Sequence, residues 1–319
     1  MNKVLLKSVV ALGMLHAAER AATAKPPPPP PCNPAANGIA YINSNVTGNI
    51  YTMGWDGSCK TLVYSGAAIY PSWSLDGASL AFHDASGPAG NGVYTIPATG
   101  GSSTLITSKV NTFPARSAWS PGPTLTGYEM IAFTDQGPTG LFDVLVVRPD
   151  GTGRRTLTDG ALDNFDPSWS RFGDKIAVER EGDVVVYRLA LNVSGELVIA
   201  STEEISNLAC SPLYNATFVG FPSFARTSDD LLLFATINGV RDVWRVSSDR
   251  CNPTRLTDSA AEGSGYARAA CWKADDSQFV HEGPKTKNSG VEIAWRRNAD
   301  GSNRTALGNT SQSNYGCRP

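Results

Sequence analysis

The sequence lacks the features that mark most enzymes and nucleic-acid-binding proteins. Its 319 residues include only three histidines, and its formal net charge of −2 provides no basic field for nucleic acid or anionic lipid. No Cys-x-x-Cys pair is present, so a zinc site or a thioredoxin-type motif has little support. The chain also lacks a Gly-x-Ser-x-Gly elbow, a phosphate-binding glycine loop and a His-Glu-x-x-His metal helix. Whether it is an enzyme stays open, with a negative answer favoured and no catalytic residue assigned.

Beyond the N-terminus, no segment has the roughly 20 apolar residues needed to span a bilayer. At the N-terminus, Lys3 and Lys7 precede a short apolar stretch, and Ala22-Thr23-Ala24 offers a small-residue cleavage site. We predict a signal peptide over residues 1–24; the alternative is an ordinary N-terminal helix. Residues 25–37 contain six consecutive prolines and are expected to form a semi-rigid linker, with an SH3-type ligand as the alternative. The protein is therefore expected to be periplasmic or secreted.

The chain does contain a repeat with five copies. Each copy has an aromatic residue, small residues, a Trp or Phe anchor, a polar turn and an apolar strand. The copies begin at Tyr70, Phe113, Phe165, Phe221 and Tyr266. The anchors are Trp73, Trp119, Trp169, Phe224 and Trp272, separated by 46, 50, 55 and 48 residues. We expect these large side chains to fill the space between neighbouring repeat units.

Each copy has a second half with its own turn. A further strand leads to Asp-Gly or Gly-Gly, which supply the positive φ of hairpin turns, and a short strand then ends in leucine. The interval from this leucine to the next aromatic is eight residues in four cases: Leu62–Tyr70, Leu105–Phe113, Leu157–Phe165 and Leu307–Tyr315. Four antiparallel strands per unit of about 50 residues are typical of a β-propeller blade.

Counting a first unit that opens at Gly38 predicts an all-β, six-bladed β-propeller over residues 38–319. The C-terminal segment 314–319 is expected to close the ring by supplying the missing inner strand of blade one. Six cysteines in an exported chain favour disulfides, and they allow fifteen connectivities: Cys32, Cys59, Cys210, Cys251, Cys271 and Cys317. Their places in the predicted blades favour the pairs Cys32–Cys59 and Cys271–Cys317. We expect a monomer.

The motif Pro-Ser-Trp-Ser with Asp-Gly, an apolar strand and Thr-Leu-Thr resembles the TolB-type propeller repeat, also called the WD40-like or PD40 repeat. Residues 73–77 are the closest copy, whereas Phe224 replaces tryptophan and Trp272 lacks the preceding proline. The resemblance covers about residues 38–319. It implies architecture more than function, because similar blades occur in the periplasmic TolB partner protein, in gating domains of prolyl peptidases and in some polysaccharide lyases.

Two groups of polar residues are candidates for a binding face. His83 and His281 follow the second strand of two units, and each precedes an acid, Asp84 and Glu282, so a metal pair is one interpretation and two exposed loop histidines the other. Acids also gather in the loops that enter the anchor strands, where they could bind Ca²⁺ or a basic partner: Asp159, Asp163, Asp166, Asp258 and Glu262. Turn formation is the simpler explanation for these acids.

We therefore expect an exported, non-enzymatic β-propeller that binds an envelope or secreted protein or peptide, without a cofactor other than a possible Ca²⁺. The alternative is a lyase- or hydrolase-like carbohydrate-active enzyme, or a glycan-binding protein, that uses the mouth of the central channel and His83 or His281.

Overall fold

The structure is a computed structural model that describes residues 32–33, 36–43, 48–112, 116–247, 249–286, 289–308 and 313–318. The expected signal peptide, the six prolines and Phe113 lie outside these residues. The described part is built of strands, joined by turns and by the short 3-10 helix η2 (Pro212–Asn215). None of the helices within these ranges is long and apolar enough to cross a membrane. The all-β class is thus confirmed.

The strands form five antiparallel sheets, which we call sheets A to E. Sheet A has seven strands in the order β23 (Ser313–Cys317), β1 (Ile39–Ile42), β2 (Gly48–Met53), β3 (Thr61–Trp73), β4 (Ser79–Gly87), β5 (Gly90–Pro97) and β6 (Thr104–Ser108). Sheet B has β7 (Ala118–Trp119), β8 (Ile131–Gln136), β9 (Phe142–Val147) and β10 (Arg155–Thr156). Sheet C has β11 (Asn164–Trp169), β12 (Lys175–Arg180), β13 (Asp183–Leu191) and β14 (Leu197–Glu204). Sheet D has β15 (Phe218–Phe224), β16 (Leu231–Ile237), β17 (Val240–Val246) and β18 (Thr254–Arg255). Sheet E has β19 (Arg268–Trp272), β20 (Gln278–Pro284), β21 (Glu292–Asn298) and β22 (Thr305–Ala306).

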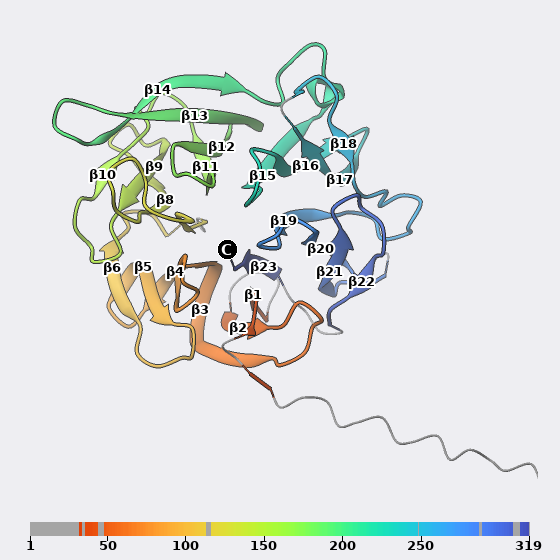
Figure 1. Cartoon of the computed structure of the whole chain (residues 1–319), viewed down its shortest axis with the longest axis horizontal. Coiled ribbons are helices and arrows are strands. Elements are labelled where there is room, and N and C mark those ends of the chain that lie inside the picture. Colours follow the sequence, from red (N-terminus) through yellow and green to blue (C-terminus); the bar gives the residue numbers. More distant parts are fainter. Residues whose placement is uncertain are drawn as a thin grey trace, which may run out of the picture. The chain divides into compact units, whose positions relative to one another are not determined.

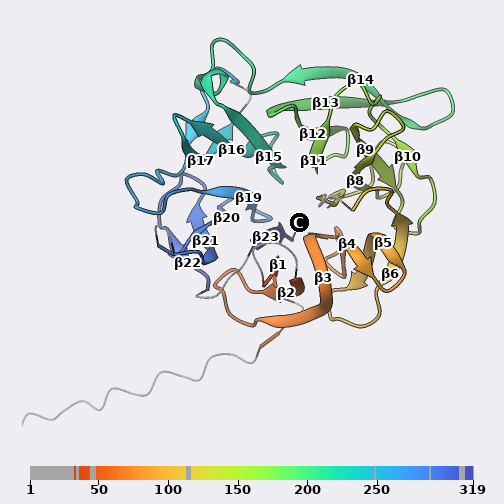
Figure 2. The same cartoon turned by 180° about the vertical axis from the view of Figure 1, so that it is seen from behind.

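The sheets stand around a common centre, with β11, β15, β19 and β23 innermost and β6, β10, β14, β18 and β22 at the rim (Figures 1 and 2). The apolar core lies between neighbouring sheets. Trp169 of sheet C packs in one cluster with Ala132 and Val146 of sheet B, and Trp272 of sheet E shares another with Leu232 of sheet D. All five anchors are at most 8% exposed. Each anchor therefore lies where large aromatic burial joins one sheet to the next.

The prediction of six separate four-stranded blades is wrong. The structure has four four-stranded sheets and one seven-stranded sheet. The difference arises in β3, which runs without a break through the interval from Leu62 to Tyr70. Ala68 pairs with Gly48 of β2 on one side and with Asp84 of β4 on the other, so one strand serves both predicted units. The two ends of sheet A then pack on each other in a single cluster.

The recurring Pro-Ser-Trp sequence links each inner strand to a neighbouring inner strand through side-chain hydrogen bonds. The indole N–H of Trp73 donates to the carbonyl of Gly316 at 3.2 Å, and that of Trp169 donates to the carbonyl of Ala118 at 3.0 Å. The serine before each of these tryptophans bonds the following sheet. Ser72 Oγ accepts from Trp119 N at 2.9 Å, and Ser168 Oγ accepts from Phe224 N at 3.1 Å. The motif recurs because both side chains satisfy buried polar groups across a junction.

The ring is closed by the C-terminal strand and by disulfides. β23 pairs antiparallel with β1, as the sequence predicts, and Cys271–Cys317 joins β19 of sheet E to β23 of sheet A. The other disulfides are Cys32–Cys59 and Cys210–Cys251, so both pairings favoured from the sequence are present. Cys210–Cys251 ties the long connection between β14 and β15 to the turn between β17 and β18.

Candidate functional site

Three side chains stand out within strands β3, β11 and β15, where the chain is kinked. Tyr70, Asp166 and Phe221 each precede a proline and have φ values of 50°, 50° and 53°. Each lies at a β-bulge, where the register skips between the flanking pairs. A left-handed residue in a bulge turns its side chain out of the regular alternation. We call this end of the ring, where the connections enter the inner strands, the channel mouth.

Side chains from sheets that are not neighbours meet at the channel mouth. The rings of Tyr70 (β3) and Phe221 (β15) contact each other, with centroids 6.0 Å apart. Arg116, which precedes β7, donates from Nη1 to the carbonyl of Pro222 at 3.0 Å. The space below them is only about 40 Å³ and is lined by Ser72, Ser168 and both arginines, Arg116 and Arg226. This volume suits a few waters.

Two buried carboxyl groups at the channel mouth are electrostatically strained. Burial raises the pKa of Asp166 to about 6, opposed by the nearby positive charge of Arg116. Burial, together with the charge of Asp166, raises the pKa of Glu179 to about 8. Within the described residues, neither carboxylate accepts a hydrogen bond. Burial in turn lowers the pKa of Arg116. Such a site favours a partner that brings polar groups of its own.

A second polar group borders the mouth on sheet E. Arg268 forms ion pairs with Glu282 and Glu292, each at 3.0 Å, and Tyr266 donates a hydrogen bond to Glu292. Half-buried aromatic rings accompany these charges around the ring: Tyr70, Phe142, Phe165, Phe218, Phe221 and Tyr266. The mouth therefore combines partly exposed aromatic surface with buried charge.

The two histidines are buried strand residues, so their interpretation as exposed loop histidines is wrong. His83 is 1% exposed and bonds Asn91 through Nε2, whereas His281 is 2% exposed and accepts from Arg297. They do not occupy matching positions either. His83 pairs with Ile69, four residues before its anchor, whereas the residue in that register in sheet E is Glu282. Burial lowers the pKa of His83 to about 4 and that of His281 to about 3.

Most of the acids picked from the sequence hold turns or pair with arginine. Asp84 accepts from Tyr64 Oη, Ala67 N and Ser86 N, and Asp163 accepts from Phe142 N. Asp159 caps Ala161 N, Asp258 binds Arg255, and Glu262 pairs with Arg297 and Arg304. Asp166 alone of the set lies at the mouth without such a bond. Within the described residues, no group of three or more His, Cys, Asp or Glu could hold a metal ion.

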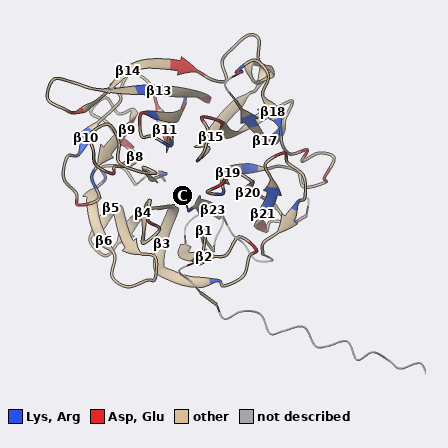
Figure 3. Cartoon of the chain, viewed as in Figure 1, with Lys and Arg blue, Asp and Glu red and all other residues tan. Residues whose placement is uncertain are grey.

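Basic and acidic residues are interspersed over the five sheets (Figure 3).

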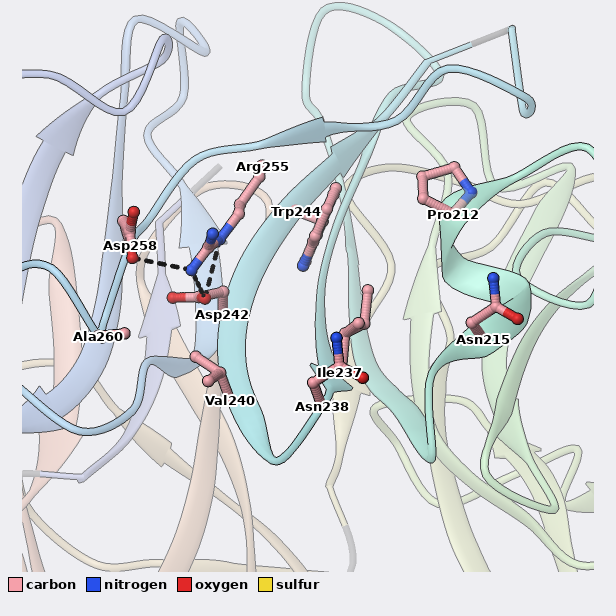
Figure 4. A pocket seen from close by; sticks show the side chains of 10 residues that line it. All are labelled: Pro212, Asn215, Ile237, Asn238, Val240, Asp242, Trp244, Arg255, Asp258 and Ala260. Atoms are coloured by element: carbon pink, nitrogen blue, oxygen red, sulfur yellow. Dashed lines mark hydrogen bonds and ion pairs between the residues drawn. The ribbon is translucent and has the colours of Figure 1, made fainter.

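A much larger hollow lies elsewhere, on sheet D, and sequence reasoning missed it. It measures about 730 Å³ and lies between η2 and strands β17 and β18 (Figure 4). We call it the sheet D pocket; its lining includes Pro212, Asn215, Asn238, Asp242, Trp244 and Arg255. The sequence did contain one signal for this pocket, the tryptophan in Val-Trp-Arg-Val. Trp244 is a large aromatic residue at a position where sheet B has Leu145.

Comparison with known proteins supports the fold. No protein-family model matches the chain, and no curated protein matches its sequence. Among solved structures, TolB from Acinetobacter baumannii superposes with a TM-score of 0.67 at 14% identity, covering 89% of this chain and 67% of that one. A protein assigned as TolB from Agrobacterium tumefaciens gives 0.60 at 16% identity, covering 86% and 88%. A chain of the nidogen/laminin complex gives 0.61 at 14%, covering 88% and 97%.

At these identities the matches establish fold alone. The chain has a TolB-like β-propeller fold, which confirms the resemblance seen in its repeats.

Proposed function

We propose that the protein is an exported, non-enzymatic scaffold that docks a protein or peptide at the channel mouth. The observation that carries the proposal is that the half-buried rings of Tyr70 and Phe221 meet beside the charges of Arg116 and Asp166. Aromatic residues and arginine are the groups most enriched at the energetic centres of protein interfaces. An incoming segment would also supply donors for the carboxylates of Asp166 and Glu179.

Two further observations support the proposal. All six cysteines are joined in disulfides, which form and persist in oxidising compartments such as the periplasm or the cell exterior. One structural neighbour is a chain of a protein–protein complex, that of nidogen and laminin. The rival role of His83 and His281 in carbohydrate chemistry loses its basis, because both rings are buried.

Site-specific photo-crosslinking in the source cells tests the proposal. A photoreactive amino acid placed at Phe165, which lies half-buried at the start of β11, should yield a discrete protein adduct. The matched control is Phe172, which is 64% exposed in the turn at the other end of β11. Tyr70→Ala should abolish the Phe165 adduct by removing one of the two rings that meet across the mouth. No adduct from Phe165, or the same adducts from both positions, would contradict the proposal.

A further inference from the structure

The sheet D pocket has a rigid floor and a tethered wall. Trp244 and Ile237 pack with one side against the core cluster that also contains Leu213 of η2, and both line the pocket. The wall opposite β17 is the connection that carries η2, which Cys210–Cys251 fastens to the β17–β18 turn. Figure 4 shows Trp244 between η2 on one side and Arg255 on the other. The pocket is therefore formed before any ligand binds, and its volume falls in the range of small-molecule sites.

The charges in the pocket are arranged in a fixed group. Arg255 donates to Asp242 through Nε at 2.9 Å and to Asp258 through Nη2 at 2.9 Å. The other oxygen of Asp242 is taken up by Thr257 Oγ1 at 2.7 Å and by Ser259 N at 2.8 Å. The guanidinium is thus neutralised and held in place. An anionic ligand would meet two carboxylates, and a cationic ligand would meet Arg255.

The remaining polar groups that line the pocket have no hydrogen-bond partner among the described residues. Across the described part of the chain, no hydrogen bond engages the side-chain amides of Asn215 and Asn238 or the indole N–H of Trp244. Both asparagines are exposed, and each amide offers two donors and one acceptor. A purely apolar ligand would leave these groups without bonds once water is displaced. The pocket requires a ligand that has both an apolar face and many neutral donors and acceptors.

We infer that the sheet D pocket binds a neutral saccharide, with one sugar ring stacked on Trp244. A pyranose ring presents an apolar C–H face, which gains dispersion and hydrophobic contact against an indole. Its hydroxyl groups both donate and accept, so they match the amides of Asn215 and Asn238 and the outer edge of Arg255. The inference goes beyond the proposed docking function, because the pocket lies on strands β17 and β18 and shares none of the residues that define the channel mouth.

Calorimetric titration of the full chain with a panel of neutral tetrasaccharides tests the inference. The probes are cellotetraose, maltotetraose, mannotetraose and chitotetraose, with adenosine and a tetragalacturonate as controls. We expect at least one neutral probe to bind, and Trp244→Ala to weaken it at least about tenfold, which corresponds to about 1.4 kcal/mol. Asn215→Ala, at an exposed residue of η2 outside the left-handed region, should weaken binding several-fold without changing the unfolding temperature. That second variant keeps the test valid if Trp244→Ala folds poorly.

Matched variants separate this inference from the docking proposal. Trp295→Ala removes the tryptophan at the same register of sheet E and should leave saccharide binding unchanged. Tyr70→Ala should likewise bind the saccharide normally while it loses the cross-linked partner. Absence of binding for every neutral probe would overturn the inference. So would equal affinity of the wild type and Trp244→Ala, or binding of adenosine or tetragalacturonate in place of the neutral sugars.

Discussion

Trp244 in sheet D and Trp295 in sheet E occupy the same place in the repeat but have different surroundings. Each pairs with the second residue of the two-residue edge strand, Arg255 in β18 and Ala306 in β22. The guanidinium of Arg304 lies over Trp295, 3.7 Å from the ring centroid, and is held there by Glu262. Among the described residues no guanidinium lies over Trp244 in this way, and its ring forms the floor of a pocket. The repeat therefore sets the position of the tryptophan ring, and the connections around it determine whether a ligand can reach the ring.

The same contrast separates Glu179 of β12 from Glu282 of β20. Each glutamate pairs with the residue that lies four positions before an anchor tryptophan. Glu179 pairs with Phe165, and Glu282 pairs with Arg268. Glu282 has an ion pair with Arg268, whereas Glu179 has none among the described residues. Equivalent positions in the repeat thus differ in whether their polar group is satisfied within the protein.

The anchors of sheets D and E offer the largest effect. Trp272→Ala should cost about 3–5 kcal/mol of unfolding free energy, since it empties a junction where Trp272 is 2% exposed. Trp272→Phe should cost less than about 1.5 kcal/mol, because Phe224 fills that place in sheet D and the indole N–H of Trp272 has no partner among the described residues. Chemical denaturation measures both changes. An unchanged unfolding curve for Trp272→Ala would contradict the view that Trp272 stabilises the junction between sheets D and E.

The disulfide Cys210–Cys251, which fastens the wall of the sheet D pocket, can be removed by mutation. Replacing Cys210 and Cys251 by serine should cost about 2–4 kcal/mol, because the bond closes a segment with a sequence separation of 41 residues. The loosened wall should also weaken saccharide binding. The control is the pair Cys271 and Cys317, whose replacement should destabilise the ring without affecting the pocket. Full saccharide affinity after loss of Cys210–Cys251 would mean that the wall needs no tether.

The contrast between the two glutamates predicts a pH dependence. The pKa of Glu179 is raised from 4.5 to about 8, so the folded state retains a proton that the unfolded state loses between these values. Its contribution to stability is therefore present below pH 4.5 and is lost as the pH rises toward 8. Glu179→Gln should stabilise the protein by about 2 kcal/mol at pH 9 and leave it unchanged at pH 4. Denaturation curves at both pH values measure the difference, and equal effects at the two would contradict it.

Much of the architecture follows from the sequence, because strands, tight turns and anchors are local features. The leucine-to-aromatic interval correctly located the start of β11 at Phe165 to within one residue. The same interval misled the count of sheets, since it cannot tell a loop from a strand that continues, as β3 does. His83 and His281 were matched by their place after the second strand of two units, but the strand register places them one residue apart. A shift of one residue moves a side chain to the other face of the sheet.

The candidate sites were less accessible from the sequence, because they depend on contacts between distant segments. The mouth brings Tyr70 to Phe221 and Arg116 to Pro222, pairs more than 100 residues apart in the chain. The sheet D pocket needs η2 to be fastened opposite Trp244, and the Cys210–Cys251 pairing was not among those favoured. Asp166 was selected as an acid in a loop, yet its place follows from the kink before Pro167. The repeats indicate which positions of the sequence vary, and the structure shows which of these positions lie in contact.

The smallest effect comes from making Trp295 resemble Trp244. Arg304→Ala removes the guanidinium that lies over the ring, and we expect a loss of about 0.5–1 kcal/mol of stability. The uncovered indole should become more accessible to acrylamide, which fluorescence quenching relative to the wild type measures; Arg304→Lys, which keeps a cation near the ring, is the control. Neutral tetrasaccharides should still not bind there, because Ala306 offers no group like Arg255 and no tethered wall faces the ring. If uncovering Trp295 alone created a saccharide site, an exposed ring would be enough, and the asparagine amides and fixed arginine of sheet D would not be what selects the ligand.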